Sequence, residues 1–191
     1  MQFGFYFDQS RCTGCYACVV ACCDWYDIGD PADGRRRLVE TEAGSFPEVQ
    51  LSYMSLSCLH CARPACAAAC PAGAIVKRPE DGIMVVDREQ CLGGDVCGAC
   101  LEACPYDVPR FVGEDNPRMQ MCTMCSDRLS AGKQPVCVAA CPMRALDCGP
   151  MDELQKKYGD TRSAAGFEWS GTTEPSLIIK PRYTGGNQDN Q

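Results

Sequence analysis

Cysteine is the residue type with which this sequence could do chemistry. Of its 191 residues, 18 are cysteine and only one is histidine. Three kinds of site use so much cysteine, namely disulfides, structural zinc and iron–sulfur clusters. Many of the cysteines are only three residues apart. Such spacing lets several thiolates converge on one metal centre.

Sixteen of the cysteines form four groups of four. The first group, C-x2-C-x2-C-x3-C, comprises Cys12, Cys15, Cys18 and Cys22. The second, C-x2-C-x4-C-x3-C, comprises Cys58, Cys61, Cys66 and Cys70. The third, C-x5-C-x2-C-x3-C, comprises Cys91, Cys97, Cys100 and Cys104. The fourth, C-x2-C-x11-C-x3-C, comprises Cys122, Cys125, Cys137 and Cys141.

The first group has the spacing of the [4Fe–4S] run of bacterial ferredoxins, and the other groups are that run with insertions. Disulfide frameworks usually staple shorter chains in oxidising compartments, and zinc usually takes two well-separated pairs. The sequence therefore predicts four [4Fe–4S] clusters, with iron bound through these sixteen cysteines. Zinc and disulfides are the weaker alternatives.

The C-x3-C ending that all four groups share has a mechanical reason. Cysteines four positions apart lie on one face of a helical turn, and Pro71, Pro105 and Pro142 follow three of the groups and end the turn. In two-cluster ferredoxins the fourth cysteine binds the other cluster. We therefore expect each turn to lie between two clusters.

Two cysteines and the single histidine lie outside this pattern. Cys22, rather than the adjacent Cys23, keeps the shared spacing, so we expect Cys23 and Cys148 to be small buried thiols. His60 precedes a ligand in the second group. Because that group has a full set of cysteines, we expect His60 to pack or to form a hydrogen bond near the third cluster, and the alternative is that it tunes or ligates the cluster.

The composition excludes several classes of function. A net charge of −7 argues against nucleic-acid binding, which needs basic surface. No apolar run approaches the ~20 residues of a membrane span, and we expect no secretory signal at the N-terminus. No phosphate loop, nucleophile elbow or pair of carboxylates is recognisable, so we expect no catalytic residue and no enzyme activity of this protein on its own.

Bound clusters would add further negative charge, because each oxidised iron–sulfide core carries about +2 against four thiolates. Basic residues beside the ligands are candidates to offset it, and the alternative is that they are ordinary surface arginines. They are Arg11, Arg63, Arg128 and Arg144.

Short elements separate the cysteine groups, which predicts a small α+β fold with short helices and hairpins. We expect strands near 3–7, 37–41, 49–56, 74–77, 83–86 and 176–180, and a helix over 151–158. In the insertion at 24–57, we expect Trp25, Tyr26 and the run Arg35–Arg37 either to contact a partner subunit or to form a solvated loop. Thr184–Gln191 is expected to be disordered.

Four segments carry a resemblance to a known family. They are DQSRCTGCYACVVAC at 8–22, CLHCARPACAAACP at 58–71, CLGGDVCGACLEACP at 91–105 and CTMCSDRLSAGKQPVCVAACP at 122–142. With these segments the chain resembles the iron–sulfur electron-transfer subunit of the dimethyl-sulfoxide reductase family of molybdenum/tungsten pterin oxidoreductases. Its one departure is the third group, where five residues instead of two separate Cys91 from Cys97.

The resemblance implies how the cysteines are shared among four clusters. One cluster takes Cys12, Cys15, Cys18 and Cys141, and its neighbour takes Cys122, Cys125, Cys137 and Cys22. A third takes Cys58, Cys61, Cys66 and Cys104, and the fourth takes Cys91, Cys97, Cys100 and Cys70. Two bicluster ferredoxin-like domains are then nested, with residues 51–105 as the inner domain and residues 1–50 plus 106–191 as the outer one.

The resemblance also implies a non-catalytic subunit that relays single electrons. Its partners would be a large molybdenum/tungsten pterin catalytic subunit and a membrane quinone-linked anchor subunit or another redox partner. The chain would be membrane-associated through these partners, either exported with a signal-bearing partner or on the cytoplasmic side. The alternative is a free polyferredoxin or an accessory electron carrier of a hydrogenase or a formate-linked enzyme.

Overall fold

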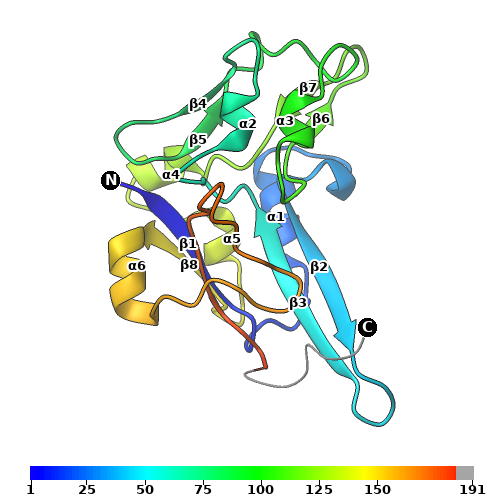
Figure 1. Ribbon diagram of the computed structural model, residues 1–191, viewed down its shortest axis with the longest axis vertical. Helices are drawn as coiled ribbons and strands as arrows, with labels where there is room; N and C mark the ends of the chain where they lie inside the picture. Colours follow the sequence, from blue (N-terminus) through cyan, green and yellow to red (C-terminus); the bar gives the residue numbers. More distant parts are fainter. Residues whose placement is uncertain (184–191) are drawn as a thin grey trace.

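A three-stranded sheet ties the two ends of the chain together in the computed structural model, which describes residues 1–183 (Figure 1). Strand β1 (Phe3–Asp8) is central, antiparallel to β8 (Leu146–Pro150) and parallel to β9 (Leu177–Lys180). The disorder predicted for Thr184–Gln191 concerns residues outside those described.

Alternation along β1 divides its side chains between two layers. Phe5 and Phe7 face the main core, whereas Tyr6 faces helix α6 (Met151–Tyr158). The Tyr6 ring stacks on the Tyr158 ring, with 3.6 Å between their centroids and an interplanar angle of 4°. The sheet therefore separates α6 from the part of the molecule that holds most of the cysteines.

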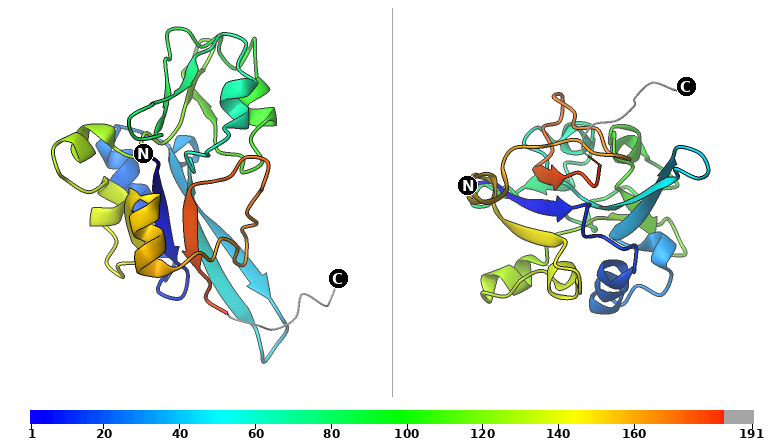
Figure 2. Two further views of the ribbon diagram at one scale, coloured as in Figure 1. Left: turned by 60° about the vertical axis from the view of Figure 1, so that its left-hand side comes forward. Right: turned by 90° about the horizontal axis from the view of Figure 1, so that it is seen from below.

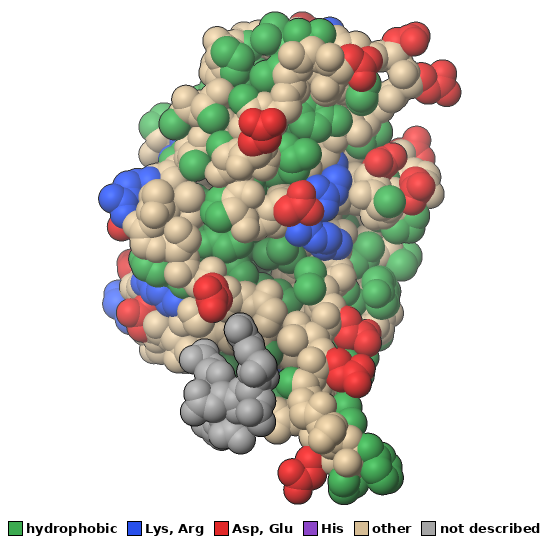
Figure 3. All heavy atoms as spheres, turned by 45° about the vertical axis from the view of Figure 1, so that its right-hand side comes forward, with side chains coloured by type: hydrophobic (Ala, Val, Ile, Leu, Met, Phe, Trp, Pro, Cys, Tyr) green, Lys and Arg blue, Asp and Glu red, His purple; other side chains and the backbone are tan. Residues whose placement is uncertain are grey.

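Three two-stranded hairpins complete the β structure. They are β2 (Arg36–Ala43) with β3 (Gln50–Ser57), β4 (Ile75–Lys77) with β5 (Met84–Val86), and β6 (Arg110–Val112) with β7 (Arg118–Gln120). The β4–β5 and β6–β7 hairpins lie together at one end of the molecule, and the β2–β3 hairpin extends toward the other end (Figures 1 and 2). Hydrophobic and acidic side chains gather at its tip (Figure 3), where Phe46 is 92% exposed.

Four helices lie at the C-x3-C endings of the cysteine groups. They are α1 (Ala17–Trp25), α2 (Ala65–Ala68), α3 (Ala99–Glu102) and α5 (Val136–Ala139). The last three are single turns that end just before a Cys-Pro pair, because proline cannot continue a helix. No proline follows the first group, and α1 runs on to Trp25. The remaining helical segments are the 3-10 turn η1 (Pro31–Asp33) and α4 (Ser126–Ser130).

The structure confirms a small α+β fold with short helices and hairpins, and confirms the strands and the helix predicted from the sequence. Strands β6, β7 and β8 and helix α4 were not predicted. No helix in residues 1–183 is both long and apolar enough to cross a membrane.

The expectation for Arg35–Arg37 was wrong in its central residue. Arg36 is 3% exposed and lies in the interior, so it neither contacts a partner nor belongs to a solvated loop. Its neighbour Arg37 donates hydrogen bonds to the backbone oxygens of Tyr106 and Asp107 in the same chain.

The carboxylate of Asp8 links the end of β1 to β9. It is buried and accepts hydrogen bonds from the hydroxyl and the backbone N–H of Ser10, and Lys180 Nζ lies 3.4 Å away. Burial alone would raise the pKa of Asp8, but the hydrogen bonds from Ser10 and the charge of Lys180 bring it below its ordinary value.

Replacing this carboxylate with an amide is therefore expected to destabilise the protein. Asp8→Asn removes an ionised acceptor from a buried site, which costs about 1–3 kcal/mol, or about 2–4 °C in melting temperature for each kcal/mol. Anaerobic thermal melts of the cluster-loaded protein measure this loss. The difference should stay constant between about pH 5 and 8, where the carboxylate is ionised in both the folded and the unfolded chain.

Asp160→Asn is the matched control, because Asp160 pairs with Arg162 in an exposed ion pair of the kind that contributes little to stability. Equal losses in the two variants would contradict the importance given to Asp8.

Candidate iron–sulfur cluster sites

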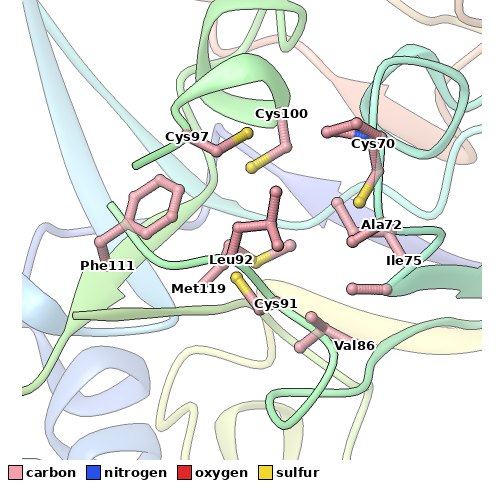
Figure 4. A pocket seen from close by; sticks show the side chains of 12 residues that line it. Cys70, Ala72, Ile75, Val86, Cys91, Leu92, Cys97, Cys100, Phe111 and Met119 are labelled. Carbon is pink, nitrogen blue, oxygen red and sulfur yellow. The ribbon is translucent and has the colours of Figure 1, made fainter. Parts of the chain in front are cut away.

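Two cavities are each lined by four of the predicted ligands. The first cavity, of about 320 Å³ including its mouth, has on its wall Cys12, Cys15, Cys18 and Cys141, which we call site 1. The second, of about 330 Å³, has Cys70, Cys91, Cys97 and Cys100, which we call site 4. In site 4 the four sulfur atoms point toward one shared space (Figure 4).

The other eight predicted ligands form two further sets, recognised by repulsion between neighbouring thiolates. Besides burial, repulsion from Cys122, Cys137 and Cys125 raises the pKa of Cys22, and these four residues are site 2. Burial and then repulsion from Cys104 and Cys61 raise the pKa of Cys66 to about 11. Burial raises the pKa of Cys58, and repulsion from Cys122 of site 2 and from Cys66 and Cys61 raises it further. Site 3 accordingly comprises Cys58, Cys61, Cys66 and Cys104.

Each set therefore combines three cysteines of one group with the last cysteine of another. The packing of the short helices brings cysteines of different groups into one set. Helix α1, with the end of the first group, packs against α5, with the end of the fourth, and α2 packs against α3 in the same way. The assignment of each set to one cluster stays a prediction.

The loop after the first cysteine of a group directs a backbone N–H at that cysteine's sulfur. The sulfur atoms of Cys12, Cys58 and Cys122 each accept a hydrogen bond from the residue two positions further on. These donors are Gly14, His60 and Met124, all of which have a positive φ. A left-handed conformation costs about 1–2 kcal/mol for a non-glycine residue, and complete burial of His60 and Met124 holds them in it.

The insertion in the third group keeps this backbone geometry. Two positions after Cys91 lies Gly93, again with a positive φ of 88°, and the N–H of Cys97 is bonded to the carbonyl of Gly93 at 2.9 Å. The five-residue spacer thus folds back on itself, and both Cys91 and Cys97 reach site 4.

The four sites are neighbours in the order 1, 2, 3, 4. Thiolate repulsion couples Cys137 of site 2 to Cys18 of site 1, and Cys58 of site 3 to Cys122 of site 2. It also couples Cys100 of site 4 to Cys66 of site 3. Neighbouring sites along this order thus have sulfur atoms within range of each other, from site 1 to site 4.

The donor set and its spacing fit an iron–sulfur cluster better than a single ion. Within residues 1–183, no three His, Cys, Asp or Glu side chains meet closely enough to hold one metal ion. Instead, the sulfurs surround a space. Burial favours the neutral thiol, and the pKa values of Cys61, Cys66, Cys100 and Cys137 are raised to about 11. Holding these sulfurs as thiolates therefore requires a positively charged core among them.

The basic residues that act on the pKa values of the ligands are not the four arginines suggested by the sequence. The side chains of Arg11, Arg63, Arg128 and Arg144 donate to backbone carbonyls at or near the surface. Burial raises the pKa of the site 2 thiols Cys22, Cys122 and Cys137, and the charge of Arg36 offsets part of that rise. The Lys77 ammonium, which donates to the carbonyl of Cys61 at 2.7 Å, likewise offsets part of the rise in the pKa of Cys61. The serines within strand β3, an otherwise largely buried strand, are the sequence signal for a polar network around Arg36.

The remaining residues of interest take supporting positions. His60 is fully buried, and its Nδ1 accepts a hydrogen bond from the N–H of Met84 at 3.0 Å. Burial lowers its pKa to about 3, so the ring is neutral. Cys23 is buried beside the turn at Gly34, and burial raises the pKa of Cys148, which lies near Cys137, to about 12.

Comparison with known proteins gives two family matches. Residues 49–151 match the 4Fe-4S dicluster domain, and residues 5–22 match the 4Fe-4S binding domain. The dicluster match includes the second, third and fourth cysteine groups, and the shorter match covers the first. The cofactors are therefore [4Fe–4S] clusters.

Individual relatives are similar over most of the chain. The B subunit of the anaerobic dimethyl sulfoxide reductase of Escherichia coli (strain K12) is 45% identical over 94% of this chain and 89% of its own length. The B subunit of the same reductase from Haemophilus influenzae is 42% identical over the same shares. The iron–sulfur subunit of the nitrate-inducible formate dehydrogenase of Escherichia coli is 36% identical over 90% of this chain and 63% of its own length. This protein belongs to the family of [4Fe–4S] iron–sulfur subunits of molybdopterin oxidoreductases, in which the B subunits of anaerobic dimethyl sulfoxide reductases and the iron–sulfur subunits of formate dehydrogenases are also found.

Proposed function

We propose that this chain is the electron-transfer subunit of a pterin oxidoreductase and binds four [4Fe–4S] clusters, one at each of sites 1 to 4. The succession of four neighbouring cysteine sets carries the proposal. The two end sites line cavities that open to the surface, so that electrons can enter at one end and leave at the other.

When bound, each cluster takes up and releases one electron. The residues of this chain hold the sites in sequence and control their surroundings. Helix α1 contains cysteines of two neighbouring sites, and α2, α3 and α5 each contain one cysteine and are followed two residues later by a cysteine of the neighbouring site, so each short turn sets the spacing between two sites. Backbone N–H groups and a buried guanidinium favour added negative charge, and burial keeps water away.

We propose that the two cluster pairs form nested units, with residues 51–105 inside and residues 1–50 plus 106–191 outside. The packing of α1 on α5 and of α2 on α3 supports this arrangement. Strand β3 pairs with β2 along its whole length and leads directly to the second cysteine group, so it connects the two units.

The partners proposed for this subunit are a large molybdenum/tungsten pterin catalytic subunit and a membrane quinone-linked anchor subunit. Similarity to the B subunits of dimethyl sulfoxide reductases and to formate dehydrogenase subunits supports both. Association with the membrane would then occur through the partners, on either side.

Purified anaerobically, the chain is expected to contain about sixteen irons, four for each site. Cys15→Ser, at site 1, should lose one cluster or convert it to a three-iron form, which lowers the count. The matched control Cys148→Ser removes a thiol outside the four sets and should keep the full count. Iron and sulfide analysis measures both, and a wild-type count near eight would contradict four clusters.

In the proposed arrangement each cluster takes three cysteines from one group and one from another, a sharing that we call the crossing of the groups. The crossing predicts which substitutions affect the same cluster. Cys22→Ser and Cys137→Ser should perturb one and the same paramagnetic signal, although the two residues belong to different groups. Cys22→Ser and Cys12→Ser, from the same group, should perturb different signals. Electron paramagnetic resonance of the reduced variants tests this. If Cys12 and Cys22 shared a signal, the crossing would be wrong.

The relay function predicts a stable complex. Affinity purification of the native chain from anaerobically grown cells should recover a pterin-containing subunit. When the complex is mixed rapidly with the electron donor of that subunit, the clusters of this chain should become reduced. A chain recovered alone, and fully reducible by a soluble carrier, would favour the free polyferredoxin instead.

A further inference from the structure

Arg36 is a buried cation that has no acidic partner. The ion pairs of residues 1–183 do not include it, and its side chain is almost fully buried. It lies over the ring of Phe5, with its central carbon 4.8 Å from the ring centroid. Burying an unpaired charge is costly, so other negative charge must surround it.

That negative charge comes from cysteines of two sites. Burial would lower the pKa of the Arg36 guanidinium, but thiolates at Cys137, Cys18, Cys122 and Cys22 raise it. Cys18 belongs to site 1 and the other three belong to site 2. Arg36 therefore lies within the electrostatic reach of two neighbouring sites at once.

Two serines lie within hydrogen-bond distance of the guanidinium, and one of them also contacts a ligand of site 1. Arg36 Nη1 lies 2.9 Å from Ser55 Oγ, and Nη2 lies 2.9 Å from Ser57 Oγ. Ser55 Oγ is also 3.4 Å from Cys18 Sγ. The Ser57 hydroxyl donates to the backbone carbonyl of Cys58 at 3.4 Å.

The direction of these hydrogen bonds follows from the groups involved. A guanidinium has only donors, so both serine oxygens accept from Arg36. Each hydroxyl proton is then free to be donated elsewhere. A thiolate sulfur can only accept, and so the proton of Ser55 is directed to Cys18. Arg36 thus orients one neutral donor, the Ser55 hydroxyl, toward a ligand of site 1.

We propose that Arg36 is a positioning residue that raises the reduction potentials of the clusters at sites 1 and 2, at both sites by its own charge and at site 1 also by aligning Ser55. The inference rests on the proposed function, since it concerns clusters held at these sites. One electron added from an external donor makes a site more negative by one unit, with no bond formed or broken. A nearby fixed positive charge stabilises that reduced state.

The test is a potentiometric titration of the intact complex, monitored by electron paramagnetic resonance, together with iron analysis. In Arg36→Met the midpoint potentials of sites 1 and 2 should become more negative, so that less than half of each is reduced at the wild-type midpoint. Sites 3 and 4 should keep their potentials. Arg36→Lys, which keeps the charge, should shift less than Arg36→Met.

Two further variants make the result specific. Ser55→Ala should lower the potential of site 1 while site 2 stays unchanged. Arg162→Met removes one positive charge from an exposed ion pair and should shift no site. Signals are assigned to sites with the cysteine variants described above.

Unchanged midpoints in an Arg36→Met protein with full iron content would overturn the inference, as would equal shifts at all four sites. If the Arg36→Met protein loses iron, the Ser55→Ala variant is the deciding test. An unchanged midpoint potential of site 1 in that variant overturns the inference. Failure of the proposed function would be seen separately, as fewer than sixteen irons in the wild-type chain.

Discussion

Buried negative charge is the constraint on which this structure depends. Sixteen cysteines must face inward as thiolates in a chain whose net charge is already −7. Isolated thiolates would not remain ionised there, because burial favours the neutral form. The iron–sulfide core supplies most of the compensation, and the protein adds backbone N–H groups, the ammonium of Lys77 and the guanidinium of Arg36.

The fold is organised to meet that constraint with little regular structure. Single-turn helices are too short to be stable alone, and proline ends three of them. Each turn is useful because its cysteine and the cysteine that follows it belong to two neighbouring sites. The sheet formed by β1, β8 and β9 then fixes both ends of the chain, so that groups distant in sequence contribute to one site.

Much of the fold and of the sites could be predicted, because the spacing of cysteines along the chain depends on the geometry in which they bind a metal centre. The four groups, the turns and the main hairpins follow from residue type and period. The burial of Arg36 could not be read from the run Arg35–Arg37, since alternation along an edge strand does not say which arginine faces inward. Strand β8 (Leu146–Pro150) contains glycine and proline, so propensity argued against it, and pairing with β1 overrode that preference. The left-handed conformation of His60 likewise depends on tertiary packing, not on local preference.

The central claim is that four clusters are neighbours in the order 1, 2, 3, 4, each held by three cysteines of one group and one of another. Anomalous diffraction from crystals of the intact protein at the iron absorption edge tests it most directly. We predict four iron centres in the order of sites 1 to 4, each bonded to its own set of cysteines. Fewer centres, or a centre held by all four cysteines of a single group, would contradict it.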